Sequence, residues 1–258
     1  MSTIGKLEKF RQNLTFKCLL QPRMEEVFRT DYRLKGKWHQ EFFQNDNPIT
    51  LELGCGKGEY TVALAKLYPD RNFIGIDIKG ARLWKGAREV EQLGLKNVCF
   101  VRTNIDFIEW IFGKDEIDSI WITFADPQLR SPRKRLTGGM FLERYAKFLK
   151  PGGTVNLKTD SRFLHEYTAA MVEANRLELL CKSTDIYNQQ QPAFPSELKT
   201  VQTFYEQYFL KMGLPITYLG FRLENKDSQR CLTFAEPEWD AAYWLEKESQ
   251  GRTPGRIR

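Results

Sequence analysis

The segment Ile49-Thr-Leu-Glu-Leu-Gly-Cys-Gly-Lys-Gly58 decides the fold, because it joins a short apolar strand pattern to three closely spaced glycines. Glycine has no Cβ, so a loop built on Gly54, Gly56 and Gly58 can adopt left-handed dihedrals and let a ligand approach the backbone closely. The residues that follow, Glu59 to Leu67, have a helical pattern. A strand, a glycine-rich turn and a helix in this order are typical of the first unit of a parallel α/β sheet.

Strand and helix patterns continue to alternate along the chain, and helix breakers such as Gly94 and Gly113 stand where helices must end. The sequence predicts an α/β fold with helices on both faces of a mostly parallel sheet and late strands that close one edge. The predicted strands are Ile49–Leu53, Asn72–Asp77, Val98–Arg102, Ser119–Phe124, Thr154–Thr159, Leu177–Lys182, Ile216–Leu223 and Cys231–Phe234. The predicted helices include Glu59–Leu67, Ala81–Leu93, Asp106–Phe112, Phe141–Leu149 and one from Asp160 to about Asn175.

A single core accounts for most of the chain, because 41% of its 258 residues are hydrophobic. We assign residues 48–240 to one domain. Residues 1–47 are rich in basic and aromatic side chains without a clear period and are predicted to form an N-terminal arm or cap, and residues 241–258 to form a basic C-terminal tail. No apolar run is long enough to cross a membrane and no secretory pattern is present at the start, so a cytoplasmic protein is expected.

Composition also limits the possible sites. The five cysteines are scattered and never spaced as Cys-x-x-Cys, and the chain has only two histidines. Neither a disulfide framework nor a zinc site is therefore indicated, and we expect reduced, mostly buried cysteines and no metal. The net charge of +6 is a modest bias toward polyanionic partners, and it becomes informative only where the basic residues cluster.

The glycine spacing distinguishes between two classes of cofactor. A dinucleotide site requires G-x-G-x-x-G, which seats a pyrophosphate on a helix N-terminus, whereas this chain has G-x-G-x-G with Glu59 at the position of the third glycine. A carboxylate there is a poor neighbour for phosphate. S-adenosylmethionine (AdoMet) has no phosphate and carries a sulfonium and an amine, so Glu52 can hold its methionyl end beside Gly54 and Gly56.

Polar side chains follow the next two strands. Asp77 ends the second strand, where a carboxylate can accept hydrogen bonds from ribose hydroxyls, and Asn104 follows the third, where an amide can read an adenine edge. Each of these side chains alone could be a solvated residue at a strand end. Taken together with the glycine loop, they favour an AdoMet site where the carboxyl ends of the strands meet.

The fourth strand ends in Asp126-Pro127, and a basic cluster of Arg130, Arg133, Lys134 and Arg135 follows within ten residues. Most charge runs are simply exposed loops. Next to a carboxylate at the mouth of the predicted site, however, this one favours contact with the phosphates of a polyanion.

At this point the sequence resembles the tRNA (guanine-N7)-methyltransferase family of class I, AdoMet-dependent enzymes. The motifs that carry the resemblance lie between about residues 36 and 225. They are LELGCGKGEY (51–60), Asp126-Pro127 followed by Lys134-Arg135, Phe141-Leu-x-x-Tyr145, Leu157-Lys-Thr-Asp160, and Thr203-Phe-Tyr-Glu206 with Gly213 and Ile216 downstream. The resemblance implies a Rossmann-like seven-stranded sheet and methyl transfer from AdoMet to N7 of a guanine in tRNA, by family analogy position 46 of the variable loop.

The family's site residues transfer onto matching positions of this chain. The resemblance implies that AdoMet is contacted by Glu52, Asp77, Asn104 and Asp126, that Asp126 is catalytic, and that the substrate is faced by Arg130, Asp160, Thr203, Phe204, Tyr205 and Glu206. The chain departs from the common motifs F-P-D-P-W-P-K and T-K-F-E, since it reads Phe124-Ala-Asp-Pro-Gln-Leu-Arg130 and T-F-Y-E. The missing tryptophan leaves open which residue stacks on the target base.

Alternatives remain for several positions. Asp160 could be the N-cap of the next helix, and Thr203 with Glu206 could form a capping box. Asp126 could orient either the amine of AdoMet or the guanine edge. Three rival functions are a methyltransferase for another substrate, a tRNA-binding module without catalysis and, less favoured by the glycine spacing, a NAD-dependent reductase. The sequence is compatible with a monomer or a homodimer.

Overall fold

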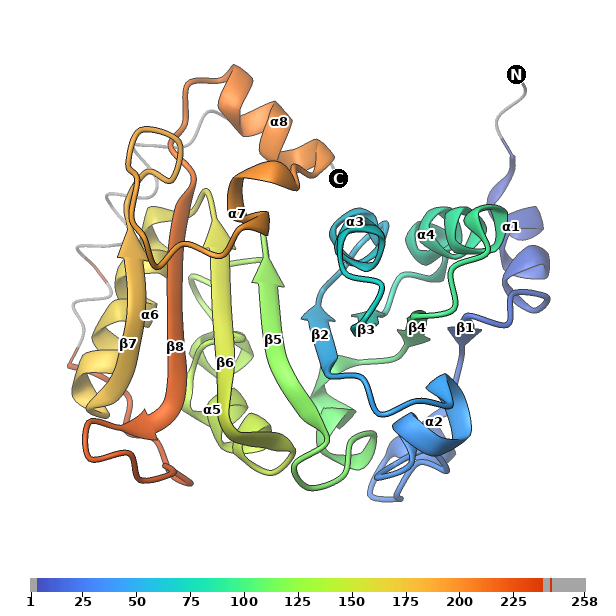
Figure 1. The fold of residues 1–258 in the computed structure, drawn as a ribbon, viewed down its shortest axis with the longest axis horizontal. Coiled ribbons are helices and arrows are strands. Elements are labelled where there is room, and N and C mark those ends of the chain that lie inside the picture. Colours follow the sequence, from blue (N-terminus) through green and yellow to red (C-terminus); the bar gives the residue numbers. More distant parts are fainter. Residues whose placement is uncertain (1–3, 239–241, 243–258) are drawn as a thin grey trace.

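The computed structural model describes residues 4–238 and 242, and its centre is one mixed sheet (Figure 1). The sheet order is β1-β4-β3-β2-β5-β6-β8-β7. All pairings are parallel except those of β8, which runs antiparallel to β6 and to β7. The strands are β1 Leu19–Leu20, β2 Ile49–Leu53, β3 Asn72–Asp77, β4 Val98–Arg102, β5 Ile117–Thr123, β6 Leu149–Thr159, β7 Leu177–Ser183 and β8 Thr217–Asn225.

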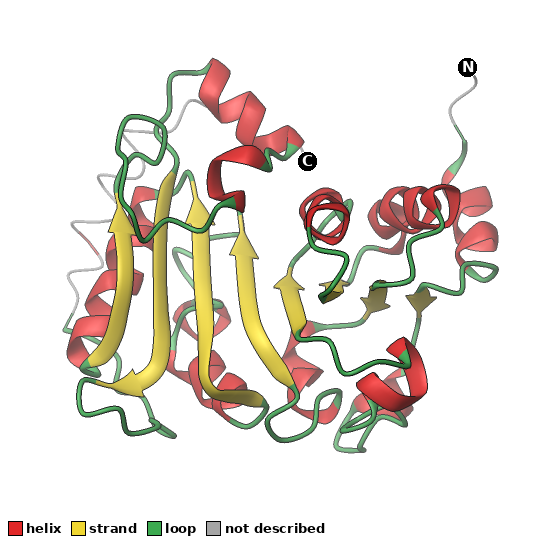
Figure 2. Cartoon of the chain, viewed as in Figure 1, coloured by secondary structure: helices red, strands yellow, loops and turns green. Residues whose placement is uncertain are grey.

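Helices cover both faces of the sheet, as the sequence predicts (Figure 2). α3 and α4 pack on one face and α5 and α6 on the other, with α1 lying beside α4. The α-helices are α1 Lys6–Asn13, α2 Met24–Val27, α3 Glu59–Leu67, α4 Gly80–Leu93, α5 Gly139–Ala146, α6 Arg162–Ala174, α7 Glu197–Thr200 and α8 Phe204–Lys211. The other described helices are η1 Trp38–Phe43, a π-helix, and two 3₁₀-helices, η2 Ile105–Trp110 and η3 Pro132–Lys134.

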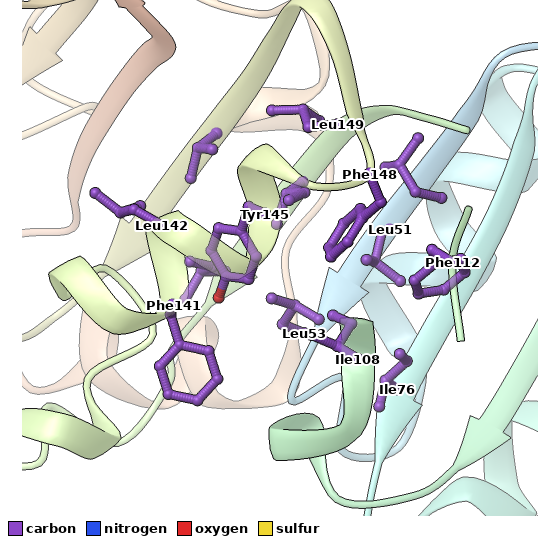
Figure 3. Packing of buried hydrophobic residues seen from close by; sticks show 14 of the residues in the cluster. Leu51, Leu53, Ile76, Ile108, Phe112, Phe141, Leu142, Tyr145, Phe148 and Leu149 are labelled. Carbon is purple, nitrogen blue, oxygen red and sulfur yellow. The ribbon is translucent and has the colours of Figure 1, made fainter. Parts of the chain in front are cut away.

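The alternation of side chains along β2 shows how the core is divided. Leu51 and Leu53 point into the cluster under α5, where Figure 3 shows them near Phe148, Ile108 and neighbouring apolar side chains. Glu52 lies between them in sequence, so it points to the opposite face, toward α3. The strand is buried on both faces, so Thr50 and Glu52, which alternate with its apolar residues, are buried as well.

Most sequence predictions of the elements are confirmed, and the exceptions have physical reasons. The sheet has eight strands rather than seven because Leu19–Leu20 pairs with β4, and two residues are too few to show an alternating pattern. The strand predicted at Cys231–Phe234 is not formed. The prediction rested on the apolar residues of this segment, and Phe234 is buried although the segment is not paired as a strand. The helix predicted at Asp106–Phe112 is the 3₁₀-helix η2.

The N-terminal segment is packed on the sheet rather than detached from it. Trp38 is fully buried in the same core cluster as Leu51, and its indole nitrogen donates to the Ile111 carbonyl at 3.0 Å. Most of the C-terminal tail predicted at 241–258 lies outside the described residues. Among the residues that the structure describes, no helix is long and apolar enough to cross a membrane, and no three side chains form a metal-binding group.

Candidate active site

The predicted site residues gather at the carboxyl edge of the parallel strands, the upper edge of the sheet in Figure 1. From β2 the chain adds β3 and β4 on one side of the sheet and then places β5 and β6 on the other. β2 and β5 are direct neighbours, with Leu53 opposite Ile122. Ligands bind outside such a switch point in open α/β sheets, because the loops that leave it diverge.

The glycine loop after β2 is open on the side that faces away from the core. Gly54, Gly56 and Gly58 have φ angles of +73°, +59° and +72°, which only glycine adopts without strain. A Cβ at Gly54 or Gly56 would meet no atom within 4 Å, whereas a Cβ at Gly58 would lie 2.4 Å from the Phe100 ring. The first two glycines therefore leave room for a ligand, and the third permits close packing.

Asp77, at the end of β3, fixes the shape of this loop. One carboxylate oxygen accepts a hydrogen bond from the Gly56 amide at 3.0 Å, and the other accepts one from the Lys79 amide at 2.7 Å. The side chain is 8% exposed, so it reaches the surface of the site with lone pairs still available. Ile78, the next residue, is 58% exposed and was not singled out from the sequence, although an apolar side chain directly after an acidic strand end is a usable signal.

Glu52 lies beneath the glycine loop and is 3% exposed. One carboxylate oxygen accepts from the amide and the hydroxyl of Thr61, and the other accepts from the Thr123 hydroxyl at 2.6 Å. Burial raises the pKa of Glu52 to about 7, against the opposing effect of these hydrogen bonds. Thr61 lies in the first turn of α3 and Thr123 ends β5, so this carboxyl group connects two elements beside the switch point.

The raised pKa of Glu52 predicts a pH-dependent stability. A carboxyl group whose pKa rises from 4.5 to about 7 on folding contributes stability below pH 4.5 that is lost as the pH rises through 7. The full difference corresponds to about 3 kcal/mol. We expect the free energy of unfolding of the wild type, relative to that of Glu52→Gln, to fall by this amount between pH 4.5 and pH 8. Urea denaturation of both proteins at each pH measures it; parallel pH curves would contradict the assignment.

Asn104 follows β4 and is exposed. Its side-chain oxygen accepts a hydrogen bond from the Asp106 amide at 3.1 Å, so it caps η2. This contact uses only the side-chain oxygen, so the cap and the predicted adenine contact through the amide nitrogen are compatible. The role toward AdoMet remains a prediction.

The segment after β5 is held in an unusual backbone conformation. Phe124 and Gln128 both have a φ of +49°, on either side of Asp126. Non-glycine residues with positive φ cost about 1–3 kcal/mol each and occur often at functional sites. Asp126 is exposed, and one of its oxygens accepts from the Gln128 amide at 3.0 Å. The chain thus holds a carboxylate at the carboxyl edge of β5, next to the glycine loop of β2.

The basic cluster divides into two parts. Arg130, Arg133 and Lys134 are exposed, as phosphate contacts require. Arg135 is 3% exposed and turned inward: its guanidinium lies 4.5 Å from the ring centre of Tyr167 and donates to the Leu129 carbonyl at 3.1 Å. In this position the Arg135 cation packs α6 against the loop, and its contact with substrate stays a prediction.

The motif that ends in Asp160 and the motif from Thr203 to Glu206 are only partly exposed at the surface. Asp160 is half-buried and follows β6, but the N-cap of α6 is Ser161, whose hydroxyl accepts from the Leu164 amide at 3.2 Å. Thr203 and Glu206 form the capping box of α8, with the Thr203 hydroxyl accepting from the Glu206 amide at 3.2 Å.

The substrate contacts expected of Thr203 and Glu206 stay predictions, since both side chains are engaged in the capping box of α8. Thr203 is 8% exposed and Glu206 is fully buried. Phe204 and Tyr205 are 56% and 43% exposed and can meet a substrate.

Sequence reasoning missed the residue that holds α8 in place. Lys158, on β6, is fully buried and forms an ion pair with Glu206 at 2.7 Å. Its ammonium also donates to the carbonyls of Leu198 at 2.7 Å and Val201 at 3.0 Å, which uses all three protons. Burial lowers the pKa of Lys158. The available signal was a lysine inside a strand predicted to be buried, since lysine is rarely buried without a partner.

Comparison with known proteins assigns this arrangement to a family. Residues 46–219 match a family model described as "Putative methyltransferase". A tRNA (guanine-N(7)-)-methyltransferase of Bacteroides thetaiotaomicron is 49% identical over 222 residues, which are 86% of this chain and 87% of that protein. The chain belongs to the tRNA (guanine-N(7)-)-methyltransferase family. A second member, from Christiangramia forsetii, is also 49% identical, and the match covers 87% of this chain and all of that protein.

Solved structures agree with this family in fold. The 16S rRNA methyltransferase KamB superposes with a TM-score of 0.54 at 14% identity, covering 76% of this chain and 96% of that one. A structure of an antibiotic-related methyltransferase gives a TM-score of 0.53 at 18% identity, covering 76% of this chain and 96% of the other. At these identities the likeness shows the methyltransferase fold alone.

Proposed function

We propose that this chain transfers a methyl group from AdoMet to N7 of a guanine in tRNA, at position 46 of the variable loop. The observation that carries the proposal is the exposed Asp126 carboxylate at the carboxyl edge, beside a glycine loop that is open at Gly54 and Gly56. The membership of the tRNA (guanine-N(7)-)-methyltransferase family supports the choice of substrate.

The residues present fit AdoMet. The open side of Gly54 and Gly56 provides space against the backbone without a phosphate-binding third glycine. Asp77 would accept hydrogen bonds from the ribose hydroxyls, and the exposed side chain of Ile78 offers an apolar surface to the adenine. Asn104 would contact the edge of that ring. Glu52 would act from beneath the loop, where the positive amine of the methionyl end favours its charged form.

When bound, AdoMet supplies an electrophilic methyl group on a sulfonium. Guanine N7 already has a lone pair in the ring plane, so the protein needs no strong base; it must align the base and stabilise the positive charge that the purine gains. Asp126 is suited to the second task, because it brings a negative charge to the edge of the site. Its backbone is preorganised by the two left-handed residues that flank it.

The exposed cations beside Asp126 favour a polyanionic substrate. Arg130, Arg133 and Lys134 are exposed and would contact phosphates, and such contacts fix the register of an RNA without reading its sequence. Enzymes that act on a base must also expose it from its stack, and a loop of a folded tRNA makes this exposure inexpensive. A small-molecule substrate would leave these three cations without a role.

A methyl-transfer assay tests the proposal. Unmodified tRNA is incubated with the protein and labelled AdoMet, and the product is mapped by chain cleavage specific for N7-methylguanine. We expect label at one variable-loop guanine. Tight, salt-dependent tRNA binding without incorporation would instead establish a binding module, and label at another position of the tRNA would retain the reaction but refute the assigned site.

A further inference from the structure

A row of aromatic rings crosses the site from the glycine loop to the segment that carries Asp126. The ammonium of Lys57 lies 4.6 Å from the ring centre of Phe204, and the rings of Phe204 and Tyr205 are 5.9 Å apart. Tyr205 stacks on Phe209 at 6.5 Å with an interplanar angle of 25°, and Phe209 lies 6.1 Å from Phe124. We call Phe204, Tyr205, Phe209 and Phe124 the aromatic row.

A hydrogen bond and a buried ion pair hold the start of α8, which carries most of the row. At one end the Phe204 amide donates to Glu59 at 2.9 Å, which joins the start of α8 to the start of α3. Behind the row, the buried Lys158–Glu206 pair fixes the first turn of α8 to β6. At the other end Phe124 is only two residues from Asp126. A rigid support is what a surface needs if it is to orient a flat ligand at low entropic cost.

Two members of the row are nevertheless open to solvent. Phe204 is 56% exposed and Tyr205 is 43% exposed, whereas Phe209 and Phe124 are half-buried. Large apolar side chains that are both rigid and exposed mark binding surfaces. The only acidic residue of α8 is Glu206, which is fully buried, so no exposed carboxylate on this helix repels an anion. Lys57 adds a positive charge at the end of the row.

We propose that Tyr205, with Phe204 beside it, is the stacking surface for the target purine base. The inference rests on the proposed function and supplies a stacking partner that the Asp126-Pro127-Gln128 segment lacks. A base stacked on Tyr205 lies between the glycine loop and Asp126, because the row connects these two elements. Aromatic side chains hold unpaired bases of RNA in this way, since every base has a flat π face.

The direct test uses an unmodified tRNA in which 2-aminopurine replaces the target guanine, because the fluorescence of this purine is quenched when it stacks. We expect quenching on binding to the wild type and to Tyr205→Phe. Tyr205→Leu retains an apolar side chain but has no ring, so quenching is lost and KM for tRNA rises about tenfold, near the lower part of the range for one base stack. The Kd for AdoMet stays unchanged.

Tyr208→Leu is the matched control. Tyr208 is on the same helix and 39% exposed, and its ring meets only the edge of Phe209, at 5.7 Å, so Tyr208→Leu leaves the proposed stacking face of Tyr205 in place and should quench the base as the wild type does. Phe204→Leu provides an independent variant in case Tyr205→Leu does not fold, and it should raise KM in the same direction. An inactive wild type would refute the proposed function. An active wild type with unchanged quenching in both leucine variants would overturn the stacking surface alone.

Sedimentation of the same proteins is a second measurement that can contradict the inference. If α8 were instead covered by a second copy of the chain, the wild type would sediment as a dimer and Tyr205→Leu as a monomer. That result would make the exposed rings a subunit contact.

Discussion

Asp126→Asn is expected to lower kcat/KM for tRNA methylation by about 10²- to 10³-fold, the usual cost of removing one preorganised electrostatic group. Asparagine retains the side-chain oxygen that accepts from the Gln128 amide, so the backbone of the segment should be preserved while the charge is removed. Labelled methyl incorporation into unmodified tRNA measures the loss. The substitution therefore tests the charge of this carboxylate separately from its structural contact.

The same variant distinguishes the two roles left open for Asp126. If the carboxylate orients the amine of AdoMet, Asp126→Asn weakens AdoMet binding in calorimetry; if it faces the guanine, kcat falls and the Kd for AdoMet is retained. Asp227→Asn, which removes an exposed carboxylate from the turn after β8, is the control and should be fully active. Activity of Asp126→Asn within a factor of about two of wild type would exclude a catalytic charge at this position.

The parallel part of the sheet could be predicted because its signals are local. Each strand from Ile49 to Thr159 is followed by a breaker or an acidic residue within a short window, and the order of β2, β3 and β4 puts their loops at one edge. The positions of Gly54, Gly56, Asp77 and Asp126 follow from that order alone. The two-residue strand Leu19–Leu20 could not be predicted, since it is defined only by its pairing with β4.

The burial of Arg135 and Glu206 could not be predicted, because it depends on partners that are distant in sequence. Arg135 stands among exposed cations in a run of basic residues, but it packs inward against the rings of Phe163 and Tyr167 from α6. Glu206 satisfies a local capping box, but its burial depends on Lys158, 48 positions away. A single sequence records which groups can pair but not which of them meet across the fold.

The buried pair of Lys158 and Glu206 should have the largest effect on stability. Removing one partner of a buried ion pair leaves an uncompensated charge and typically costs 3–5 kcal/mol. We expect Lys158→Met to lower the free energy of unfolding by about this amount and Tm by roughly 6 to 20 °C. Urea denaturation and calorimetry measure these changes. The ammonium also holds the carbonyls of Leu198 and Val201, so the loss extends to α7 and the start of α8.

A double substitution separates the charge from the packing. Glu206→Gln removes the charge left behind by Lys158→Met while keeping an oxygen for the Thr203 amide, so the double variant should recover part of the lost stability. Recovery should be incomplete, because the two carbonyls still lack their donor. Lys37→Met removes one partner of an exposed pair with Glu41 and should cost less than about 1 kcal/mol. A similar small cost for Lys158→Met would show that the buried pair does not fix α8 to the sheet.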